Sequence, residues 1–245
     1  MGGTVRLGLM TSPSLVTAVT KRTVALLPVG AFEQHAAHLP VAMDANAAFT
    51  VAEKVETLRP ASTLLLPLLP FGASDHHSGF AGTVSIGTEL LARTLAEVVA
   101  SLRQTSGVQR FLIVNGHGGN LPAIRWALDL AQRAGSDVEV RALSYWDALF
   151  DALDEQERPR HGPMGHADRY ETSIALALDP EGVDLQRMSV DGFTDGLPSW
   201  VQTSRGFRER TRGGGVGDPV GASAEEGAEY LALACDRIAG LLDQW

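Results

Sequence analysis

The 245-residue sequence predicts an α/β fold: a mostly parallel central sheet with helices on both faces, in a single domain spanning residues 1–245. Short apolar runs alternate with longer amphipathic segments four times along the chain, which is the pattern of strands and covering helices. No internal repeat, low-complexity tract or linker divides the chain, and its length is sufficient to bury a sizeable core.

The first two strands are expected where apolar runs meet proline and glycine. Residues 23–30 form an apolar run that ends in Pro and Gly, which predicts a buried strand. The segment 44–60 is rich in helix formers and stops before Pro60, so a helix is expected there. The second strand is expected within 62–70, whose prolines indicate an irregular end or an edge position.

The middle of the chain repeats this alternation more clearly. Residues 87–107 predict a helix with Thr88 as N-cap and Gly107 as C-terminal cap, because leucines and a valine recur at helical spacing between them. Residues 110–116 predict a third strand, and 121–135 predict a helix with proline near its first turn.

The last third contains one more strand and two helices. A β-branched run over 137–145 predicts the fourth strand, and 169–178 predicts a helix. Residues 223–245 predict a capped amphipathic helix that closes the chain. The polar stretch 151–165 and the Gly-rich stretch 191–218 are expected to be long loops.

Composition excludes several classes of function. The formal net charge is −9 and no Lys/Arg cluster is present, which argues against a nucleic-acid partner. Cys235 is the sole cysteine, so no internal disulfide can form. No apolar run approaches the roughly 18 residues that a membrane span requires. The N-terminal residues lack the pattern of a secretory signal, so a cytoplasmic location is expected.

The seven histidines all fall between positions 35 and 166, in segments that follow predicted strands. With their acidic neighbours, in order along the four strands, they are Glu33, His35 and His38; Asp75, His76 and His77; His117; and His161 and His166. Ligands of open α/β sheets bind beyond the carboxyl ends of the strands. A single loop histidine is usually a surface residue, but placement after every strand predicts a shared site.

Carboxylate and imidazole side chains together suit Zn, Mn or Fe(II). Glu33 and His35 lie two positions apart, so an extended backbone would point both side chains the same way. Asp44 has two interpretations, a cap for the following helix or a metal ligand. His117 lies at the apex of the Gly-rich turn "VNGHGGN", and a turn alone does not need a histidine there. No H-E-x-x-H, GxSxG or CxxC motif is present.

Five segments, taken in order, resemble one known family. The segments are "EQHAAHLP", then Asp44, then "FGASDHHSGFAGTVSI", "VNGHGGN" and "GHADRYETS", and the set resembles the creatininase (creatinine amidohydrolase) family over residues 24 to 180. A C-terminal stretch, "GVGDP…ASAEEG", resembles the closing segment of the family. The resemblance implies an α/β fold, hydrolysis of cyclic or linear amides, divalent metals (Zn, Mn or Fe) and commonly a hexamer. The family includes creatininases, formamide hydrolases and peptidases that trim ribosomal peptide cofactor precursors.

The resemblance also implies a centre of two divalent ions per chain. One ion would be held by Glu33, Asp44 and His117, and the other by His35, Asp44 and Glu171, with Asp44 bridging the two. A hydroxide between the ions would then attack the amide carbon, because coordination lowers the pKa of water from about 16 towards 7.

Further residues are expected around these ligands. His166 is the expected proton donor for the departing amine. His38 is expected to orient a ligand, to touch substrate or to make a hydrogen bond behind the ligands. Ser74, His77 and Trp146 are expected to line the substrate pocket, with ordinary core packing as the alternative for Trp146.

Two positions depart from the creatinine-cleaving members of the family. Those members carry a glutamate where this chain has Gly119, and Glu171 is the expected substitute ligand. They also carry an acidic residue where this chain has Gly165, which is expected to leave room beside His166. The substrate is therefore expected to be bulkier than creatinine, such as a lactam-bearing metabolite or a peptide end.

The resulting hypothesis is a metal-dependent amidohydrolase that cleaves the C–N bond of a cyclic amide or similar small metabolite. The alternatives on the same scaffold are a peptidase that trims a ribosomal peptide cofactor precursor and a formamide hydrolase. A non-catalytic protein that binds a metal or small ligand is a weaker alternative, because five potential ligands are present. A structural metal site is the weakest, since structural zinc sites are usually rich in cysteine and this chain has one.

The closing helix carries more apolar residues than one packing face requires, which predicts a homo-oligomer, expected to be a hexamer. These residues are Tyr230, Leu231, Leu233, Ile238, Leu241, Leu242 and Trp245.

Overall fold

The computed structural model describes residues 5–135, 137–153, 164–198 and 200–245. Within this part, four strands form one sheet in the order β2-β1-β3-β4, and every neighbouring pair is parallel. The strands are β1 (Val24–Val29), β2 (Thr63–Leu65), β3 (Arg110–Asn115) and β4 (Glu139–Ser144). The predicted parallel sheet is confirmed, and the second strand lies at its edge and ends before Pro67.

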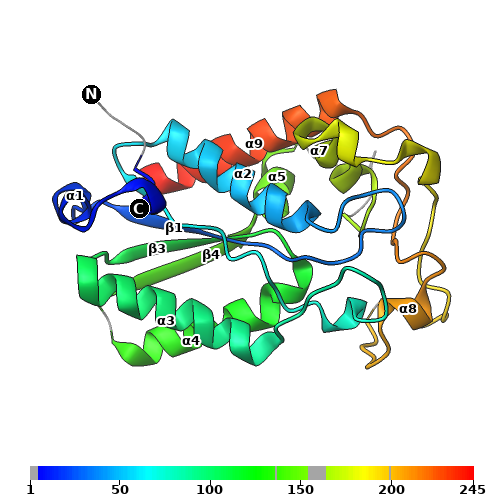
Figure 1. Cartoon of the computed structure of the whole chain (residues 1–245), viewed down its shortest axis with the longest axis horizontal. Coiled ribbons are helices and arrows are strands. Elements are labelled where there is room, and N and C mark those ends of the chain that lie inside the picture. Colours follow the sequence, from blue (N-terminus) through cyan, green and yellow to red (C-terminus); the bar gives the residue numbers. More distant parts are fainter. Residues whose placement is uncertain (1–4, 136, 154–163, 199) are drawn as a thin grey trace.

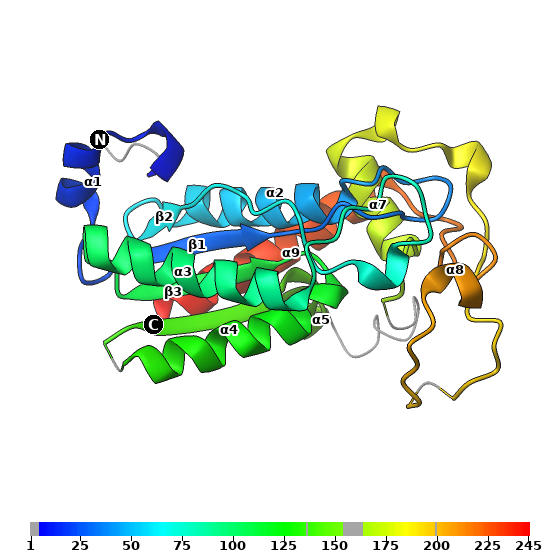
Figure 2. The same ribbon diagram turned by 60° about the horizontal axis from the view of Figure 1, so that its bottom comes forward.

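Helices cover both faces of this sheet (Figures 1 and 2). One layer consists of α2 (Met43–Leu58), α5 (Tyr145–Ala152), α7 (Arg169–Leu178) and α9 (Ala224–Asp243), and the other of α3 (Thr88–Ser106) and α4 (Leu121–Ala134). Shorter elements are α1 (Ser12–Ala18), α8 (Phe207–Arg210) and the 3₁₀ turns η1 (Leu7–Leu9), η2 (Asp75–His77), η3 (Gly118–Asn120), η4 (Pro180–Gly182) and η5 (Leu185–Arg187). The predicted α/β class is therefore confirmed.

The two layers enclose two apolar cores because successive side chains of a strand point to opposite faces. Leu26 of β1 and Leu112 of β3 pack into the core beneath α2 and α9, whereas Leu27 and Ile113 pack into the core beneath α3 and α4. All six residues of β1 are buried. The continuous apolar runs in the sequence thus reflect strands that are covered on both sides.

The helix boundaries agree with the sequence except in detail. Helix α3 begins after Gly87, not after a Thr88 cap, and ends at Gly107, whose φ of 74° is the left-handed conformation that glycine tolerates. Helix α9 begins after the N-cap Ser223, whose hydroxyl accepts a hydrogen bond from the Glu226 amide.

Some predicted loops contain helices. Helix α5 occupies the start of the predicted loop 151–165 and the last residue of the predicted fourth strand. Residues 154–163 of that loop, including His161, lie outside the described residues. The predicted loop 191–218 contains α8, and its Val216 pairs with His166 in an antiparallel bridge.

The closing helix is packed more completely than the sequence suggested. Helix α9 contacts α2, α5 and α7, and it buries Tyr230, Leu231, Ile238 and Leu242 within the chain. Leu233, Leu241 and Trp245 are half-buried, so most of the apolar surface of α9 is used within the chain and little of it is left for a subunit contact.

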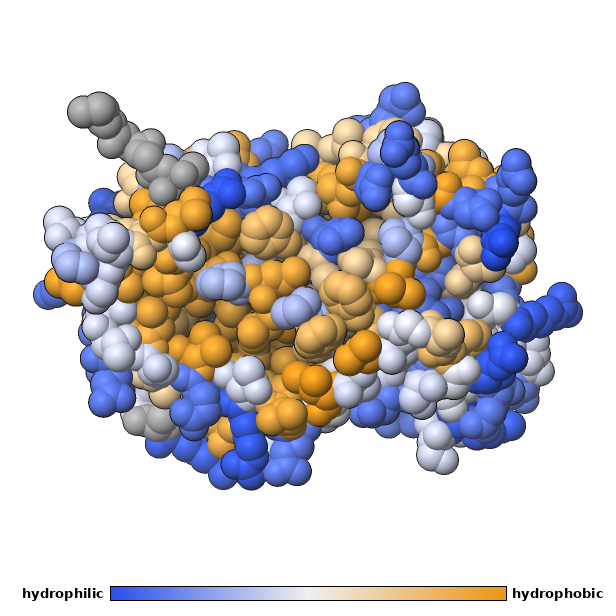
Figure 3. Space-filling view, in the orientation of Figure 1, coloured by the Kyte–Doolittle hydropathy of each residue, from blue (hydrophilic) through white to orange (hydrophobic). Residues whose placement is uncertain are grey.

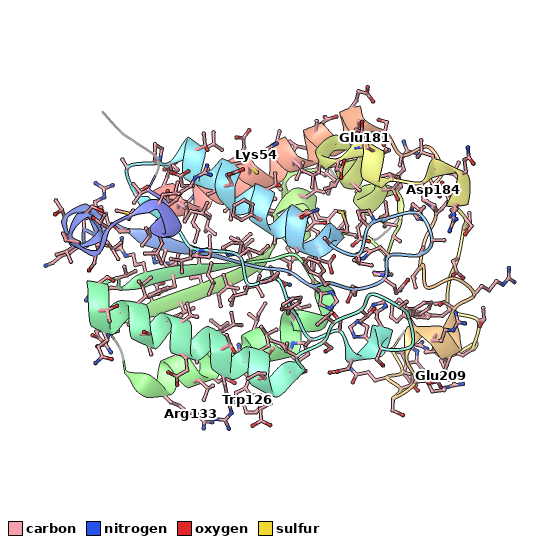
Figure 4. All side chains as sticks on the ribbon, in the orientation of Figure 1. Lys54, Trp126, Arg133, Glu181, Asp184 and Glu209 are labelled. Carbon is pink, nitrogen blue, oxygen red and sulfur yellow. The ribbon has the colours of Figure 1, made fainter. Side chains whose placement is uncertain are left out.

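An exposed apolar groove lies instead beside the sheet edge. It has a volume of about 630 Å³, and Figure 3 shows a broad apolar area on this face of the molecule. Its apolar lining is Leu7, Leu27, Leu66, Pro67, Leu69, Leu90, Val98 and Leu102. The outer faces of the helical layers are polar by comparison, with Lys54 on α2 at one side and Arg133 on α4 at the other (Figure 4).

None of the helices in the described part of the chain combines the length and the hydropathy that a membrane span requires.

Candidate metal centre

The candidate site lies where the strand order changes direction. The chain passes from β1 to β2 on one side and then returns to β3 on the other side of β1. Ligands of open α/β sheets bind at such a switch point, beyond the carboxyl ends of the strands. The loop after β1 carries Glu33 and His35, and the loop after β3 carries His117. In Figure 2 both strands end toward α7 and α8.

Asp44 reaches this point from the first turn of α2. Ala42 is the N-cap of that helix, and both carboxylate oxygens of Asp44 face histidines, so the capping interpretation is not supported. The approach requires Gly116, since a Cβ there would lie 2.3 Å from the backbone oxygen of Asp44. This contact brings the end of β3 against the start of α2.

Two asparagines of the "VNGHGGN" segment fix the position of His117. Asn115 accepts a hydrogen bond from the His117 amide at 3.1 Å and donates to the His117 carbonyl at 2.8 Å. Asn120 donates to the Gly30 carbonyl at 3.0 Å and accepts from the Ala73 amide at 2.9 Å. These side chains join the loops after β1, β2 and β3. The sequence analysis assigned them no role, although both belong to the segment "VNGHGGN".

The side chains predicted as ligands meet in one buried cluster. His117 Nδ1 lies 3.1 Å from Asp44 Oδ2, and His117 Nε2 lies 3.1 Å from Glu33 Oε2. His35 Nε2 lies 3.0 Å from Asp44 Oδ1. Glu33, His35, Asp44 and His117 are each at most 4% exposed.

Two carboxylate oxygens in this cluster have no hydrogen-bond partner among the described residues. They are Glu33 Oε2 and Asp44 Oδ2, the same atoms that face the two nitrogens of His117. At 3.1 Å from His117 each oxygen has an ion-pair contact but no well-formed hydrogen bond, and a divalent cation would satisfy such a buried carboxylate better. Glu33, His35 and Asp44 offer ligand atoms within 4.8 Å of one another, and so do His35, His166 and Glu171. The donor set fits divalent metal ions.

Glu171 joins the cluster from the first turn of α7. The Asp168 side chain caps this helix by accepting from the Glu171 amide at 3.1 Å. The Glu171 carboxylate accepts a hydrogen bond from the Ala167 amide, and Ala167 has a φ of 54°, a strained value for alanine. Glu171 Oε2 lies 3.8 Å from His35 Nε2. The carboxylate thus points toward the cluster, not into the helix packing.

The cluster shifts the pKa values of its members. Burial and the neighbouring Asp44 raise the pKa of Glu33 to about 7, and burial raises that of Glu171 to about 8. Burial would lower the pKa of His35, but the Asp44 and Glu171 carboxylates raise it to about 10. Burial opposes ionisation of Asp44, yet His35 and His117 hold its pKa below the usual range. In the metal-free protein, protons retained on Glu33, Glu171 and His35 balance the negative charge of the buried carboxylates, and divalent cations can replace these protons.

Gln34 orients two further histidines. His166 Nε2 lies 2.7 Å from the Gln34 carbonyl oxygen, which can only accept, so this nitrogen carries a hydrogen and Nδ1 faces Glu33 at 3.7 Å. The Gln34 side-chain amide donates to His77 Nδ1 at 2.7 Å, which leaves the N–H of His77 on Nε2, 3.2 Å from Glu33 Oε1. Burial and the neighbouring His35 lower the pKa of His166. Burial and the neighbouring His166 lower the pKa of His77, so both rings are neutral at neutral pH.

A cavity of about 900 Å³ opens over the cluster. Glu33, Asp44, His117, His166 and Glu171 lie at its polar floor. Its walls are largely apolar, and they include Leu121, Trp146, Phe150, Met164, Phe193, Phe207 and Val216. Phe193, Phe207 and Met164 were not singled out from the sequence, because isolated apolar residues in loops carry no local signal.

Only some of the residues expected to line the pocket do so. His77 and Trp146 line the cavity. Ser74 and His38 are buried outside the lining: the Ser74 hydroxyl lies 3.3 Å from His117 Nε2, and His38 Nε2 lies 2.9 Å from the Thr172 hydroxyl, next to Glu171. Their contacts are therefore with ligand-bearing segments.

Gly165 does not leave the room that the sequence suggested. A Cβ at this position would lie 1.8 Å from the backbone oxygen of Val216. The space beside His166 is thus filled by the segment around Val216, and a side chain at position 165 would displace that backbone.

The chain matches the family model "Creatininase: Creatinine amidohydrolase" over residues 8–242. It is 34% identical to the mycofactocin precursor peptide peptidase of Mycolicibacterium smegmatis over 98% of this chain and 91% of that protein. It is 33% identical to the peptidase of the same name from Mycobacterium ulcerans over 90% of this chain and 84% of that protein. It is also 35% identical to the creatinine amidohydrolase of Pseudomonas putida, over 67% and 68% of the two chains.

Solved structures agree with these relatives. A structure named "Creatininase Mn" superposes with a TM-score of 0.86 at 28% identity, covering 99% of this chain and 98% of that one. A mutant creatininase of "Zn-Zn type" superposes with a TM-score of 0.83 at 27% identity, with 99% and 98% covered.

Proposed function

The chain belongs to the creatininase family of amidohydrolases, and from this premise we propose that it is a dinuclear metal enzyme that trims the end of a peptide. The observation that carries the proposal is the cavity of about 900 Å³, whose floor is the ligand cluster and whose walls are largely apolar. Ligand pockets of about 300–1,000 Å³ hold molecules of drug size, far larger than creatinine. Relatives named as precursor peptide peptidases support the same substrate class.

We assign one divalent ion to Glu33, Asp44 and His117, and a second to His35, Asp44 and Glu171. The short distances from Asp44 to His35 and His117 support a bridging role for Asp44. Carboxylate and imidazole ligands suit Zn, Mn or Fe. Structural relatives are named for Mn and for Zn, which supports the first two.

When bound, the ions would polarise the amide carbonyl and lower the pKa of a water molecule from about 16 towards 7. His166 is the residue that we assign to proton movement. Its Nε2 hydrogen is committed to the Gln34 carbonyl, so Nδ1 is the atom that can accept a proton. The ring starts neutral, and it can donate to the departing amine only after it has taken a proton from the attacking water.

The residues around the ligands would preserve this arrangement. His77 Nε2 lies 3.2 Å from Glu33 Oε1, which leaves Oε2 for an ion. Ser74 and His38 lie against His117 and Thr172, so we assign them to positioning the ligands. Trp146, with the other apolar side chains of the wall, would contact the substrate.

A cyclic amide of similar bulk is the second candidate, because the match to a creatinine amidohydrolase favours a ring substrate. Formamide hydrolysis is the third candidate activity that the family allows. Creatinine itself is expected to be a poor substrate, since Gly119 and Gly165 replace the acidic residues of the creatinine-cleaving members.

A substrate panel tests the proposal. Metal-loaded enzyme would be offered a mycofactocin precursor peptide, a bulky lactam, an N-formyl amine and creatinine, and products would be identified by mass spectrometry. We expect release of a terminal fragment from the peptide, with kcat/KM at least about tenfold above that for creatinine, equivalent to about 1.4 kcal/mol. Metal-free enzyme is the control. Turnover of creatinine at the rate of the best larger amide would contradict the proposal.

We also propose that residues 1–245 act as one domain and that the chain forms a homo-oligomer, with a hexamer as the expected size. Both apolar cores flank a single sheet, which supports one domain. The groove beside β2 and α3 supports self-association, because it offers an apolar surface that a second copy could cover, with Leu90 55% exposed in its lining.

A further inference from the structure

His76 is a histidine at the cavity floor to which the assigned chemistry gives no role. It belongs to η2 in the loop after β2, and it lines the cavity. Its ring is stacked on that of His117, with the centroids 5.5 Å apart and the planes 9° from parallel. The structure shows no hydrogen bond between its ring nitrogens and another described residue. The ring of His76 is half-buried and lines the cavity, so its nitrogens are available to a ligand bound there.

Metal-ligand geometry indicates what that ligand is. Glu33, His76 and His117 offer ligand atoms that all lie within 4.8 Å of one another. Two nitrogens bound to the same zinc ion at about 2.0–2.1 Å can be at most about 4.2 Å apart. Small rotations of these side chains would therefore place all three around one ion. His77 is less suited, because its Nε2 hydrogen points at Glu33 and its Nδ1 accepts from Gln34.

Gly119 is the reason that His76 can lie so near. A Cβ at position 119 would be 2.5 Å from His76 Cε1 and 2.3 Å from His117 Nε2. Any side chain there would occupy the space between the two rings. A residue larger than glycine at position 119 would therefore displace the imidazole of His76 from its present place.

We propose that His76 is an additional ligand of the ion held by Glu33, Asp44 and His117, and that Gly119 is required for this. The inference rests on the proposed metal centre. The loop after β2 would thus contribute a donor to the ion, as the loops after β1 and β3 do. It would also give this ion two imidazole ligands, which suits Zn or Fe better than Mn.

A cysteine in place of His76 tests the assignment by a gain of signal. The His76→Cys variant would be loaded with Co²⁺, and the near-ultraviolet spectrum would be recorded. A thiolate-to-cobalt charge-transfer band is expected only if residue 76 reaches the ion. The chain is suited to this test because Cys235, its sole cysteine, is buried in the core beneath α9, where its sulfur lies 3.8 Å from the Val51 carbonyl. Wild-type protein with Co²⁺ is the control, and absence of the band in a folded, metal-loaded variant would overturn the proposal.

Affinity measurements provide an independent test. In His76→Ala, chelator competition should show that one ion is held at least about 10- to 100-fold more weakly while the other is unchanged. Free imidazole added to the buffer should restore part of that affinity. Asp137→Asn, an exposed residue just before β4 at the amino end of the strands, is the control and should hold both ions as the wild type does.

The outcomes separate this inference from the proposed function. If wild-type protein binds no ions, the metal centre itself is wrong. If wild type binds two ions and folded His76→Ala holds both with unchanged affinity, only the role of His76 is wrong. Circular dichroism of the metal-free variants establishes folding. If His76→Ala does not fold, X-ray absorption of the zinc-loaded wild type decides by the number of imidazole ligands per ion.

Discussion

Asp44 Oδ2 lies 3.1 Å from His117 Nδ1, while the second oxygen of the same carboxylate lies 3.0 Å from His35 Nε2. One side chain at the start of α2 therefore joins the loops that follow β1 and β3. Because the two histidines come from different loops, their separation is set by the docking of α2 on the sheet. This relationship makes Asp44 the residue on which both proposed ions depend.

Asp44→Asn is expected to weaken both ions and to reduce amide hydrolysis at least about 100-fold. The asparagine side chain is neutral, so the proposed bridging group loses the negative charge that both cations share. Elemental analysis after gel filtration and a hydrolysis assay measure the two effects. Asp137→Asn, an exposed carboxylate just before β4, is the control, and retention of two tightly held ions by Asp44→Asn would disprove the bridging role.

Glu171→Gln should lose one ion and retain the other. The Glu171 carboxylate lies 3.8 Å from His35, and it is not among the groups close to His117. The ion assigned to His35 would therefore lose its second carboxylate, whereas the ion at Glu33 and His117 would keep its own. Metal content near one equivalent supports the assignment, and two equivalents at wild-type affinity would contradict it.

Gly119→Ala should disturb the metal centre, whereas Gly118→Ala should not. A Cβ at 119 would lie 2.3 Å from His117 Nε2 and 2.5 Å from the Ala73 backbone oxygen, so the His117 ring must move. A Cβ at 118 meets no atom of the described residues within 4 Å. Metal affinity and activity of the matched pair measure the difference. Equal behaviour of the two variants would show that the space at 119 is not critical.

Metal-free protein should lose thermal stability as the pH rises above about 6.5, the ordinary pKa of histidine. The folded-state pKa values of Glu33 (about 7), Glu171 (about 8) and His35 (about 10) all exceed their ordinary values. Each group binds its proton more tightly when folded, so this stability is complete below the ordinary pKa and is lost as the pH passes the raised one. Below pH 6.5 His76, His77 and His166 oppose the trend, because burial lowers the pKa of each ring, that of His76 to about 4.

Bound ions should remove much of this loss, because they replace the protons on their ligands. The difference in Tm between metal-loaded and metal-free protein is therefore expected to grow from about pH 6.5 to about pH 9. Scanning fluorimetry over this range, with and without Mn²⁺, measures it. Two parallel curves would contradict the pKa shifts of the cluster.

Leu90→Arg should shift the oligomer toward smaller species. Leu90 is 55% exposed on α3 and lines the apolar groove beside β2, so a charge there would oppose burial against a second copy. Leu185, 52% exposed on η5 and outside that groove, provides the control Leu185→Arg. Light scattering measures the mass of each variant, and a monomeric wild type at micromolar concentration would refute the assembly proposal.

The regular elements were predictable wherever an apolar pattern was bounded by a local signal. The strands ending near Val29 and Asn115 run into Gly-containing turns, and α3 ends at Gly107. Helix α5 was missed because it begins at Tyr145 directly after β4, with no glycine or proline to mark the boundary. Its buried residues Tyr145, Ala148 and Leu149 do have helical spacing, and that signal was available.

The sequence by itself determined which chemistry lies at the carboxyl edge of the sheet, because histidines and carboxylates follow consecutive apolar strands. It did not determine which of these side chains touch. Only the tertiary structure placed Asp44 between His35 and His117, directed Glu171 toward His35, and withdrew Ser74 from the cavity lining. It also filled the space beside Gly165 with the backbone of Val216, a residue distant in sequence. Local patterns encode burial and backbone conformation, whereas such contacts depend on how separate loops pack over the sheet.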